Sequence, residues 1–214
     1  MSRREYNNPQ LPPSTGPSPI HYFPFTQNAT DVVGDWGSLG GSCSGFSEEG
    51  AFFDNNSIGF SKAVNAPNTE FTVIDFEFKV PAVYTSGVYA LLRVLFNNDA
   101  TINFYIAPDW GQELNASVYS RKNTYTALSL VTIPIIANTY HRITLRQNIS
   151  SDSCDLFVDG VLRNSGNLCI SSDNILQTLY IGRIEKANTR IFKGHLRNLK
   201  FYDIELTNEQ IAQL

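Results

Sequence analysis

The sequence is poor in charge and has no long hydrophobic run. Of its 214 residues, 17% are charged and 42% are hydrophobic, whereas an average domain has about 25% charged residues. This combination excludes a disordered chain and a coiled coil. No apolar run approaches the roughly 18 residues that span a bilayer, so we expect no membrane span. The net charge is −4 and the basic residues are scattered, so we expect no nucleic-acid partner.

Cysteine and the common catalytic motifs are also scarce. The chain lacks a nucleophile elbow, a Cys-x-x-Cys pair, a phosphate-binding loop and a metal-spaced histidine pair. Its three cysteines are an odd number, which does not indicate a disulfide framework; they are Cys43, Cys154 and Cys169. Buried thiols are the simplest interpretation. A Cys154–Cys169 bridge between neighbouring strands is the alternative, and the spacing does not decide between the two.

Proline is concentrated at the start of the chain. Residues 1–19, which we call the Pro-rich arm, hold five of the ten prolines. Such a segment favours extended polyproline II and suits a tether or an arm laid on a partner, with a disordered tail as the alternative. From residue 20 to 214 the composition is uniform, so we expect one domain there.

Strand-like alternation dominates this domain. In residues 71–80 one face of the run is nearly all apolar, while Asp75 and Glu77 share the other face. Asp159-Gly160 predicts a two-residue hairpin turn. The runs that read as strands are 71–80, 88–96, 101–106, 127–133, 140–146, 154–158, 178–181 and 195–202.

One helix is expected, at the C-terminal end. Residues 206–214 have Thr207 as N-cap and Gln210 in the third helical position, which together form a capping box. Many strands with a single short helix predict an all-β fold, a two-sheet antiparallel sandwich.

Three segments, in the right order, resemble one family. Residues 140–146 and 154–162 are similar to a strand followed by a Leu-Tyr-Val-Asp-Gly hairpin, and residues 192–211 to a closing Phe-x-Gly strand, tyrosine corner and Leu-Thr-x-Glu-Gln-Ile helix. Residues 21–34 are similar to an opening strand and Asp-x-x-Gly turn. These are features of laminin-G-like domains of the concanavalin A-like lectin and glucanase superfamily. The resemblance covers residues 20–214 and implies a jelly roll; it does not by itself define a function.

The resemblance also directs attention to paired carboxylates. Glucanases of this fold carry a Glu-x-Asp-x-Glu type of strand motif whose acids act as nucleophile and acid/base. Here Asp75 and Glu77 match its second half, but Val73 stands where the nucleophile would be. We therefore interpret the two acids as the solvated face of a strand, with a glycoside hydrolase that uses them as the alternative function.

Calcium is the accessory ion that the resemblance implies. Relatives often place acidic residues in the closing strand, where this chain has Arg197 and Asn198. Asp31 and Asp35 in the first loop remain the candidate calcium ligands, with ordinary turn aspartates as the alternative. We expect no other cofactor.

Aromatic residues in predicted loops are the candidate ligand-binding residues. A loop tryptophan can stack on a sugar ring or anchor a protein contact, although both tryptophans could instead plug the ends of the sandwich. We expect residues 107–126 to lie on the surface and to carry more of any interface than the Asp159-Gly160 turn. The candidates are Trp36, Trp110, Tyr119, Arg121 and Tyr125.

Together these features predict a non-enzymatic binding or adhesion module that recognises a glycan or a protein surface through loops. The first residues lack the apolar core of a signal peptide. This favours a virion-surface protein, such as a phage or virus decoration or fibre subunit assembled in a host cytoplasm, over an extracellular protein. The Pro-rich arm would then dock on a capsid or on neighbouring virion subunits.

Overall fold

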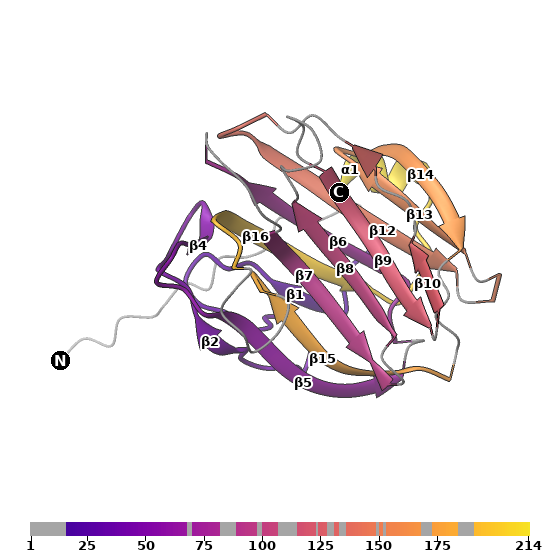
Figure 1. Ribbon diagram of the computed structural model, residues 1–214, viewed down its shortest axis with the longest axis horizontal. Helices are drawn as coiled ribbons and strands as arrows, with labels where there is room; N and C mark the ends of the chain where they lie inside the picture. The colour runs from indigo at the N-terminus through magenta and orange to yellow at the C-terminus, as the bar shows by residue number, and fades with distance from the viewer. Residues whose placement is uncertain are drawn as a thin grey trace.

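The computed structural model describes most of the predicted domain, and Figure 1 shows its strands arranged in two layers. The described residues are 16–67, 70–81, 89–97, 100–106, 115–122, 124–127, 131–132, 136–148, 150–151, 153–167, 173–183 and 191–214. The Pro-rich arm up to residue 15 lies outside this set. The division into arm and domain therefore stays a prediction.

The first layer, which we call the terminal sheet, contains the first and the last strand of the chain. Its order is β14-β13-β12-β6-β16-β4-β3, and β1 pairs with β16 in addition. All of these pairs are antiparallel. The strands are β1 (His21–Phe23), β3 (Gly45–Ser47), β4 (Gly50–Phe53), β6 (Val73–Lys79), β12 (Tyr140–Asn148), β13 (Ser153–Val158), β14 (Val161–Asn167) and β16 (Gly194–Tyr202).

The second sheet faces the terminal sheet and is also antiparallel. Its order is β10-β9-β8-β7-β15-β5-β2, and β11 pairs with β9 in addition. Two antiparallel sheets confirm the expected sandwich. The strands are β2 (Gly40–Ser42), β5 (Gly59–Pro67), β7 (Tyr89–Phe96), β8 (Thr101–Ile106), β9 (Asn115–Lys122), β10 (Thr124–Ala127), β11 (Val131–Thr132) and β15 (Ile175–Ile181).

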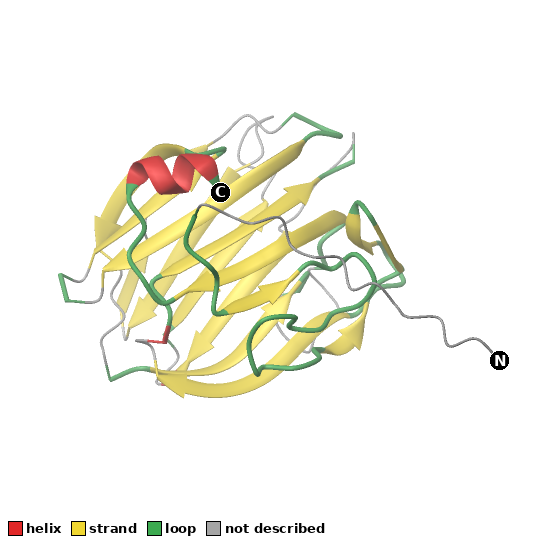
Figure 2. Ribbon diagram, turned by 180° about the vertical axis from the view of Figure 1, so that it is seen from behind, coloured by secondary structure: helices red, strands yellow, loops and turns green. Residues whose placement is uncertain are grey.

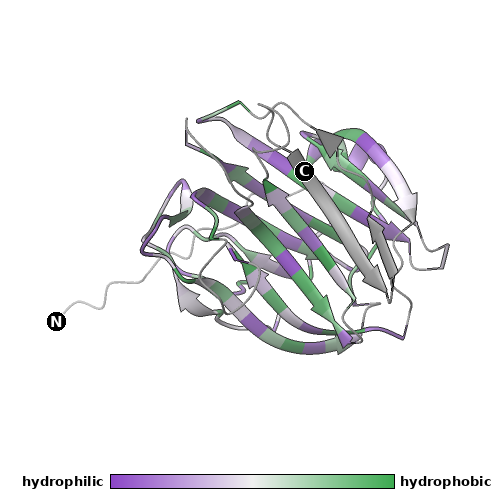
Figure 3. Ribbon diagram, viewed as in Figure 1, coloured by the Kyte–Doolittle hydropathy of each residue, from purple (hydrophilic) through white to green (hydrophobic). Residues whose placement is uncertain are grey.

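Aromatic side chains from both sheets fill the core between them. Phe76 and Phe78 of β6 are buried, as the alternation predicts, and the Phe76 ring meets that of Phe104 from β8 at 5.2 Å. Figure 3 shows the same alternation of hydrophobic and hydrophilic residues along several strands. Burial of such rings is the main stabilising contribution to a sandwich of this kind.

The helix α1 (Asn208–Gln213) lies over the outer face of the terminal sheet (Figure 2). Its N-cap is Thr207 and the predicted capping box with Gln210 is present. Arg142 and Arg146 of β12 donate to the carbonyl oxygens of Ile211 and Leu206, at 2.6 and 2.7 Å. A small second core seals the helix onto the sheet and consists of Val73, Phe157, Tyr202, Leu206 and Ile211.

The structure confirms the hairpin turn and corrects two other local expectations. Asp159 and Gly160 join β13 to β14 with φ values of 51° and 75°, the left-handed pair that a two-residue turn requires. The run 127–133 is not one strand, because β10 ends at Ala127 and β11 covers only Val131–Thr132. The stretch 107–126 is not one loop, because it contains β9 and most of β10.

The two described cysteines are at least partly buried. Burial raises the pKa of the Cys43 thiol, which donates to the Gly45 carbonyl oxygen at 3.1 Å. Cys154 is 2% exposed. Cys169 lies outside the described residues, so its bridge to Cys154 stays a prediction.

Candidate functional site

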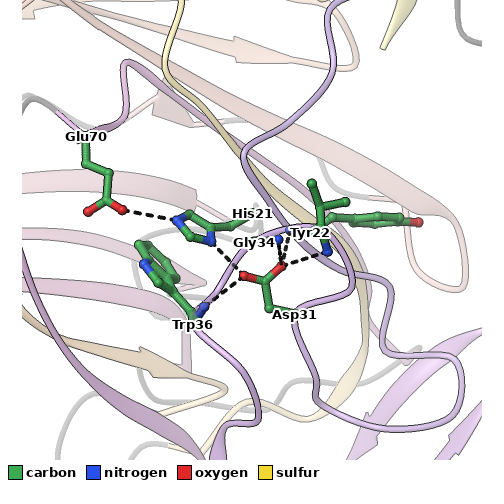
Figure 4. Close-up of polar contacts among 7 residues, drawn as sticks. His21, Tyr22, Asp31, Gly34, Trp36 and Glu70 are labelled. Carbon is green, nitrogen blue, oxygen red and sulfur yellow. Dashed lines mark hydrogen bonds and ion pairs between the residues drawn. The ribbon is translucent and has the colours of Figure 1, made fainter.

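A buried network of charged side chains links β1 to the turn that follows it (Figure 4). His21 contacts Asp31 Oδ2 through Nδ1 at 2.6 Å and Glu70 Oε1 through Nε2 at 3.2 Å. The His21 ring also stacks on Trp36, with ring centroids 3.8 Å apart. The network therefore joins three separate segments of the chain.

The carboxylate of Asp31 is surrounded by N–H groups. Its Oδ1 accepts from the backbone of Tyr22, Val33 and Gly34, and its Oδ2 accepts from the backbone of Trp36. Burial alone would raise the pKa of Asp31, but these donors and His21 hold it below its ordinary value.

Both oxygens of Asp31 face N–H donors, which is the arrangement of a turn aspartate, and calcium binding at Asp31 stays an untested prediction. Asp35 is exposed, and calcium binding there remains an untested prediction. Among the residues that the structure describes, no group of three or more His, Cys, Asp or Glu side chains could hold a metal ion.

Trp36 belongs to the core rather than to a binding loop. Its side chain is stacked on His21 and lies edge-on to Phe201, with centroids 4.9 Å apart. The residue is only 5% exposed. The prediction that Trp36 contacts a ligand is therefore wrong, and the alternative, a tryptophan that plugs the sandwich, is confirmed for this residue.

The other predicted contact residues lie on strands instead of a loop. Tyr119 and Arg121 are in β9 and Tyr125 is in β10. The register places Tyr125 opposite Arg121 on the neighbouring strand. Trp110 lies outside the described residues. The structure thus brings Arg121 and Tyr125 together along the backbone, and the exposure of this surface stays a prediction.

The two acids of β6 have different environments. Asp75 is 1% exposed and accepts from Thr144 Oγ1 at 2.6 Å, while Arg142 Nε lies 3.8 Å away. Burial raises the pKa of Asp75 to about 6, although the Thr144 bond and the neighbouring cations act in the opposite direction. The expectation that both acids are solvated is therefore wrong for Asp75, which is sealed beside the second core.

Glu77 is half-buried and held by one cation and one amide. Its Oε2 accepts from Nε and Nη2 of Arg197 at 2.9 and 2.7 Å, and its Oε1 accepts from Asn198 at 2.7 Å. A hydrolytic pair needs two carboxylates that both reach the glycosidic bond. Since Asp75 is sealed, Asp75 and Glu77 do not form such a pair in this structure.

Next to Glu77, an open pocket lies on the outer face of the terminal sheet. Its volume is about 370 Å³. One wall is formed where the β13–β14 turn touches α1, because a Cβ on Gly160 would lie 3.0 Å from the Ala212 Cα. We call it the α1 pocket; its lining residues are Glu77, Tyr140, His141, Arg142, Asp159 and Ala212.

Hydrogen bonds fix the polar groups of the α1 pocket. Asp159 accepts from His141 Nδ1 at 2.9 Å and from the Arg142 backbone N–H at 2.8 Å. The Arg197 guanidinium lies 3.6 Å from the centre of the Tyr140 ring. Burial raises the pKa of Tyr140 to about 12, so its hydroxyl stays protonated and donates to the Glu49 carbonyl oxygen.

Sequence reasoning identified only part of this pocket. The sequence pattern indicates Glu77 as an acid on a strand and Asp159 as a turn residue, whereas the other lining residues carry no motif; these are Tyr140, His141, Arg142 and Ala212. The sequence contains only an indirect signal for these residues, which is the pairing of the strands that carry them. Residues on opposite sides of Glu77 could be found only from the pairing of β6 with β12 and β16, which places Arg142 and Arg197 across from it.

The fold and the α1 pocket define a lectin-like β-sandwich domain with a polar surface site. A family model described as the concanavalin A-like lectin/glucanases superfamily matches residues 53–212. The match covers more than half of the chain, so the chain belongs to this family. No curated protein sequence matches the chain. In the described part of the chain, we find no helix with the length and hydrophobicity of a membrane span.

Solved structures share the fold at low identity. The receptor binding domain of botulinum neurotoxin D has a TM-score of 0.70 and 14% identity, over 92% of this chain and 52% of that structure. A serotype D ligand binding domain in complex with N-acetylneuraminic acid has a TM-score of 0.66 and 14% identity, with 92% and 50% covered. The chain therefore spans about half the length of these toxin domains.

Another similar structure is covered almost completely. Domain 4 of AbnA, a GH43 extracellular arabinanase from Geobacillus stearothermophilus, in complex with arabinotriose, has a TM-score of 0.61 and 15% identity. The alignment covers 91% of this chain and 97% of that domain. At such identities these likenesses show the fold.

Proposed function

We propose that the chain is a non-enzymatic carbohydrate-binding module. The observation that carries this proposal is the α1 pocket, a fixed set of hydrogen-bonding groups on the surface of a lectin-family sandwich. Small-molecule sites have volumes of roughly 300–1,000 Å³ and a few convergent polar groups, and the α1 pocket has both features. Similar structures bound to arabinotriose and to N-acetylneuraminic acid support a sugar as the ligand.

A glycan array probed with the whole chain and three variants tests this function. We expect binding to at least one glycan, and loss of binding in Ala212→Trp, whose added ring fills the α1 pocket from the exposed side of the helix. Gln213→Trp is the matched control, because it adds the same ring to the same helix outside the pocket. Trp110→Ala tests the surface predicted from the sequence. Failure of the unchanged protein to bind any glycan would refute the proposal.

The absence of catalysis is tested separately with a reducing-sugar assay on β-glucans. We expect no product above background, because Asp75 is 1% exposed and its carboxyl group is engaged by Thr144. Glucan hydrolysis that disappears in Glu77→Gln would overturn the non-enzymatic assignment.

We further propose that the module sits on a virion surface and that the Pro-rich arm attaches it to a capsid or to neighbouring subunits. The concentration of prolines in residues 1–19, ahead of a separately packed sandwich, supports this arrangement. Deletion of residues 2–15 should leave thermal unfolding of the sandwich unchanged and shift the protein from the particle fraction of a density gradient to the soluble fraction. Unchanged sedimentation with particles after the deletion would refute the role of the arm.

A further inference from the structure

We propose that the α1 pocket selects neutral saccharides and rejects saccharides that carry a carboxylate. This inference rests on the proposed function, and it adds the chemical class of the ligand. It differs from what the complex of a structural neighbour with N-acetylneuraminic acid, an acidic sugar, would suggest. This selectivity depends on which hydrogen-bonding groups in and around the pocket are already engaged.

The cations around the pocket are committed to protein groups. Arg197 directs both Nε and Nη2 to the same oxygen of Glu77. Arg142 donates through Nη2 to the Ile211 carbonyl oxygen, and its Nε faces the buried Asp75 at 3.8 Å. Lys79 Nζ lies 2.6 Å from Glu49 Oε2. Arg197 and Lys79 therefore already have carboxylate partners, and the Arg142 Nε, which makes no hydrogen bond, is buried towards Asp75, so a ligand carboxylate gains less from these cations than from unpaired ones.

The acceptor oxygens, by contrast, have unused capacity. The Asp159 side chain is 46% exposed, and each of its two oxygens accepts one hydrogen bond. An ionised carboxylate has about four lone-pair positions, so Asp159 can accept further bonds from a ligand. Sugar hydroxyl groups are donors of this kind, and hydrogen bonds from hydroxyls to a carboxylate are among the stronger ones.

The charged groups that line the pocket also disfavour an acidic ligand. Glu77 and Asp159 bring two carboxyl groups to the lining, where Arg197 pairs with Glu77 and Arg142 faces the buried Asp75. Among the residues that the structure describes, the one ionisable side chain within 4 Å of the Asp159 carboxylate is that of His141. An acidic sugar would bring a third carboxylate to this rim and would be repelled, whereas a neutral sugar would not.

The ion pair between Glu77 and Arg197 is the feature that can be altered to test the idea. Glu77→Gln removes the charge that engages Arg197, so the guanidinium becomes available to a ligand carboxylate. Asp155→Asn is a matched control, because Asp155 Oδ2 is held by Nε and Nη2 of Arg146 in the same way, at 3.1 and 2.6 Å. That pair also lies on the terminal sheet, but it does not line the pocket.

Ligand-observed NMR titrations with matched sugar pairs provide the measurement. The pairs are methyl β-D-galactoside with methyl β-D-galacturonate, and lactose with 3′-sialyllactose. The unchanged protein should bind the neutral member of a pair at least about fivefold more tightly, the ratio that a charge interaction of about 1 kcal/mol produces. Glu77→Gln should shrink or invert this ratio, and Asp155→Asn should leave it unchanged.

A second variant keeps the test decisive if Glu77→Gln does not fold. Asp159→Asn retains a residue that tolerates the positive φ of the turn and removes the exposed charge, so it too should shrink the ratio. Equal or tighter binding of the acidic member by the unchanged protein would overturn the selectivity, as would equal changes in Glu77→Gln and Asp155→Asn. Absence of binding to every neutral sugar, here and on the array, would instead refute the proposed function.

Discussion

Replacing Asp75 with asparagine should stabilise the protein at neutral pH. Folding raises the pKa of Asp75 from 3.8 to about 6, chiefly because the carboxyl group is buried. Between these two values the folded state binds more protons than the unfolded state, so stability falls as the pH rises and the full cost is present above about pH 6. Since each pKa unit is worth about 1.4 kcal/mol, this cost is about 3 kcal/mol.

Asparagine has nearly the same shape and no charge, and Thr144 Oγ1 can still donate to its carbonyl oxygen. We therefore expect Asp75→Asn to raise the free energy of unfolding at about pH 7 by as much as about 3 kcal/mol, with little change at about pH 4. Urea unfolding at both pH values measures this, with Asp155→Asn as a partly exposed control. A variant that is less stable at neutral pH, or a stability difference that does not depend on pH, would refute the reasoning.

Three further substitutions test the packing that positions the site, each by the free energy of unfolding. Gly34→Ala should cost about 3 kcal/mol, because its Cβ would lie 2.1 Å from His21 Nδ1; unchanged stability would contradict the geometry of the buried network. Trp36→Ala should cost about 3–5 kcal/mol, since the side chain is part of the core. A loss below about 1 kcal/mol would be typical of a surface residue and would contradict the burial of Trp36. Thr207→Ala should cost about 1 kcal/mol, and restoration by Ser but not by Val would identify the loss as that of the cap.

Local sequence signals predicted the parts of the fold that depend on neighbouring residues. The alternation in residues 71–80, the Asp159-Gly160 turn and the Thr207 capping box are all present as expected. The strand β9 was missed because it has few strongly apolar residues, and its place depends on pairing with β8, where Phe104 faces Val118 in the register. Contacts with other segments, and not the residues of the strand itself, define such a strand.

The same reason explains the errors in the candidate site. The Gly-Asp-Trp-Gly context of Trp36 is typical of a loop, but His21 and Phe201 bury the ring. Asp75 reads as half of an exposed pair, but α1 and the second core close over that end of β6. The α1 pocket combines residues from β6, β12, the hairpin turn and α1. No spacing of residues along the chain predicts that these elements meet.

Mapping of backbone amide shifts tests the central claim, that the α1 pocket holds a neutral saccharide, most directly. The isotope-labelled chain would be titrated with the neutral glycan that binds best on the array. We expect the largest shift changes on the amides of Arg142, Asp159, Gly160 and Ala212, and we expect Ala212→Trp to abolish them. Saturable changes confined to β9 and β10, with the pocket amides unmoved, would contradict it.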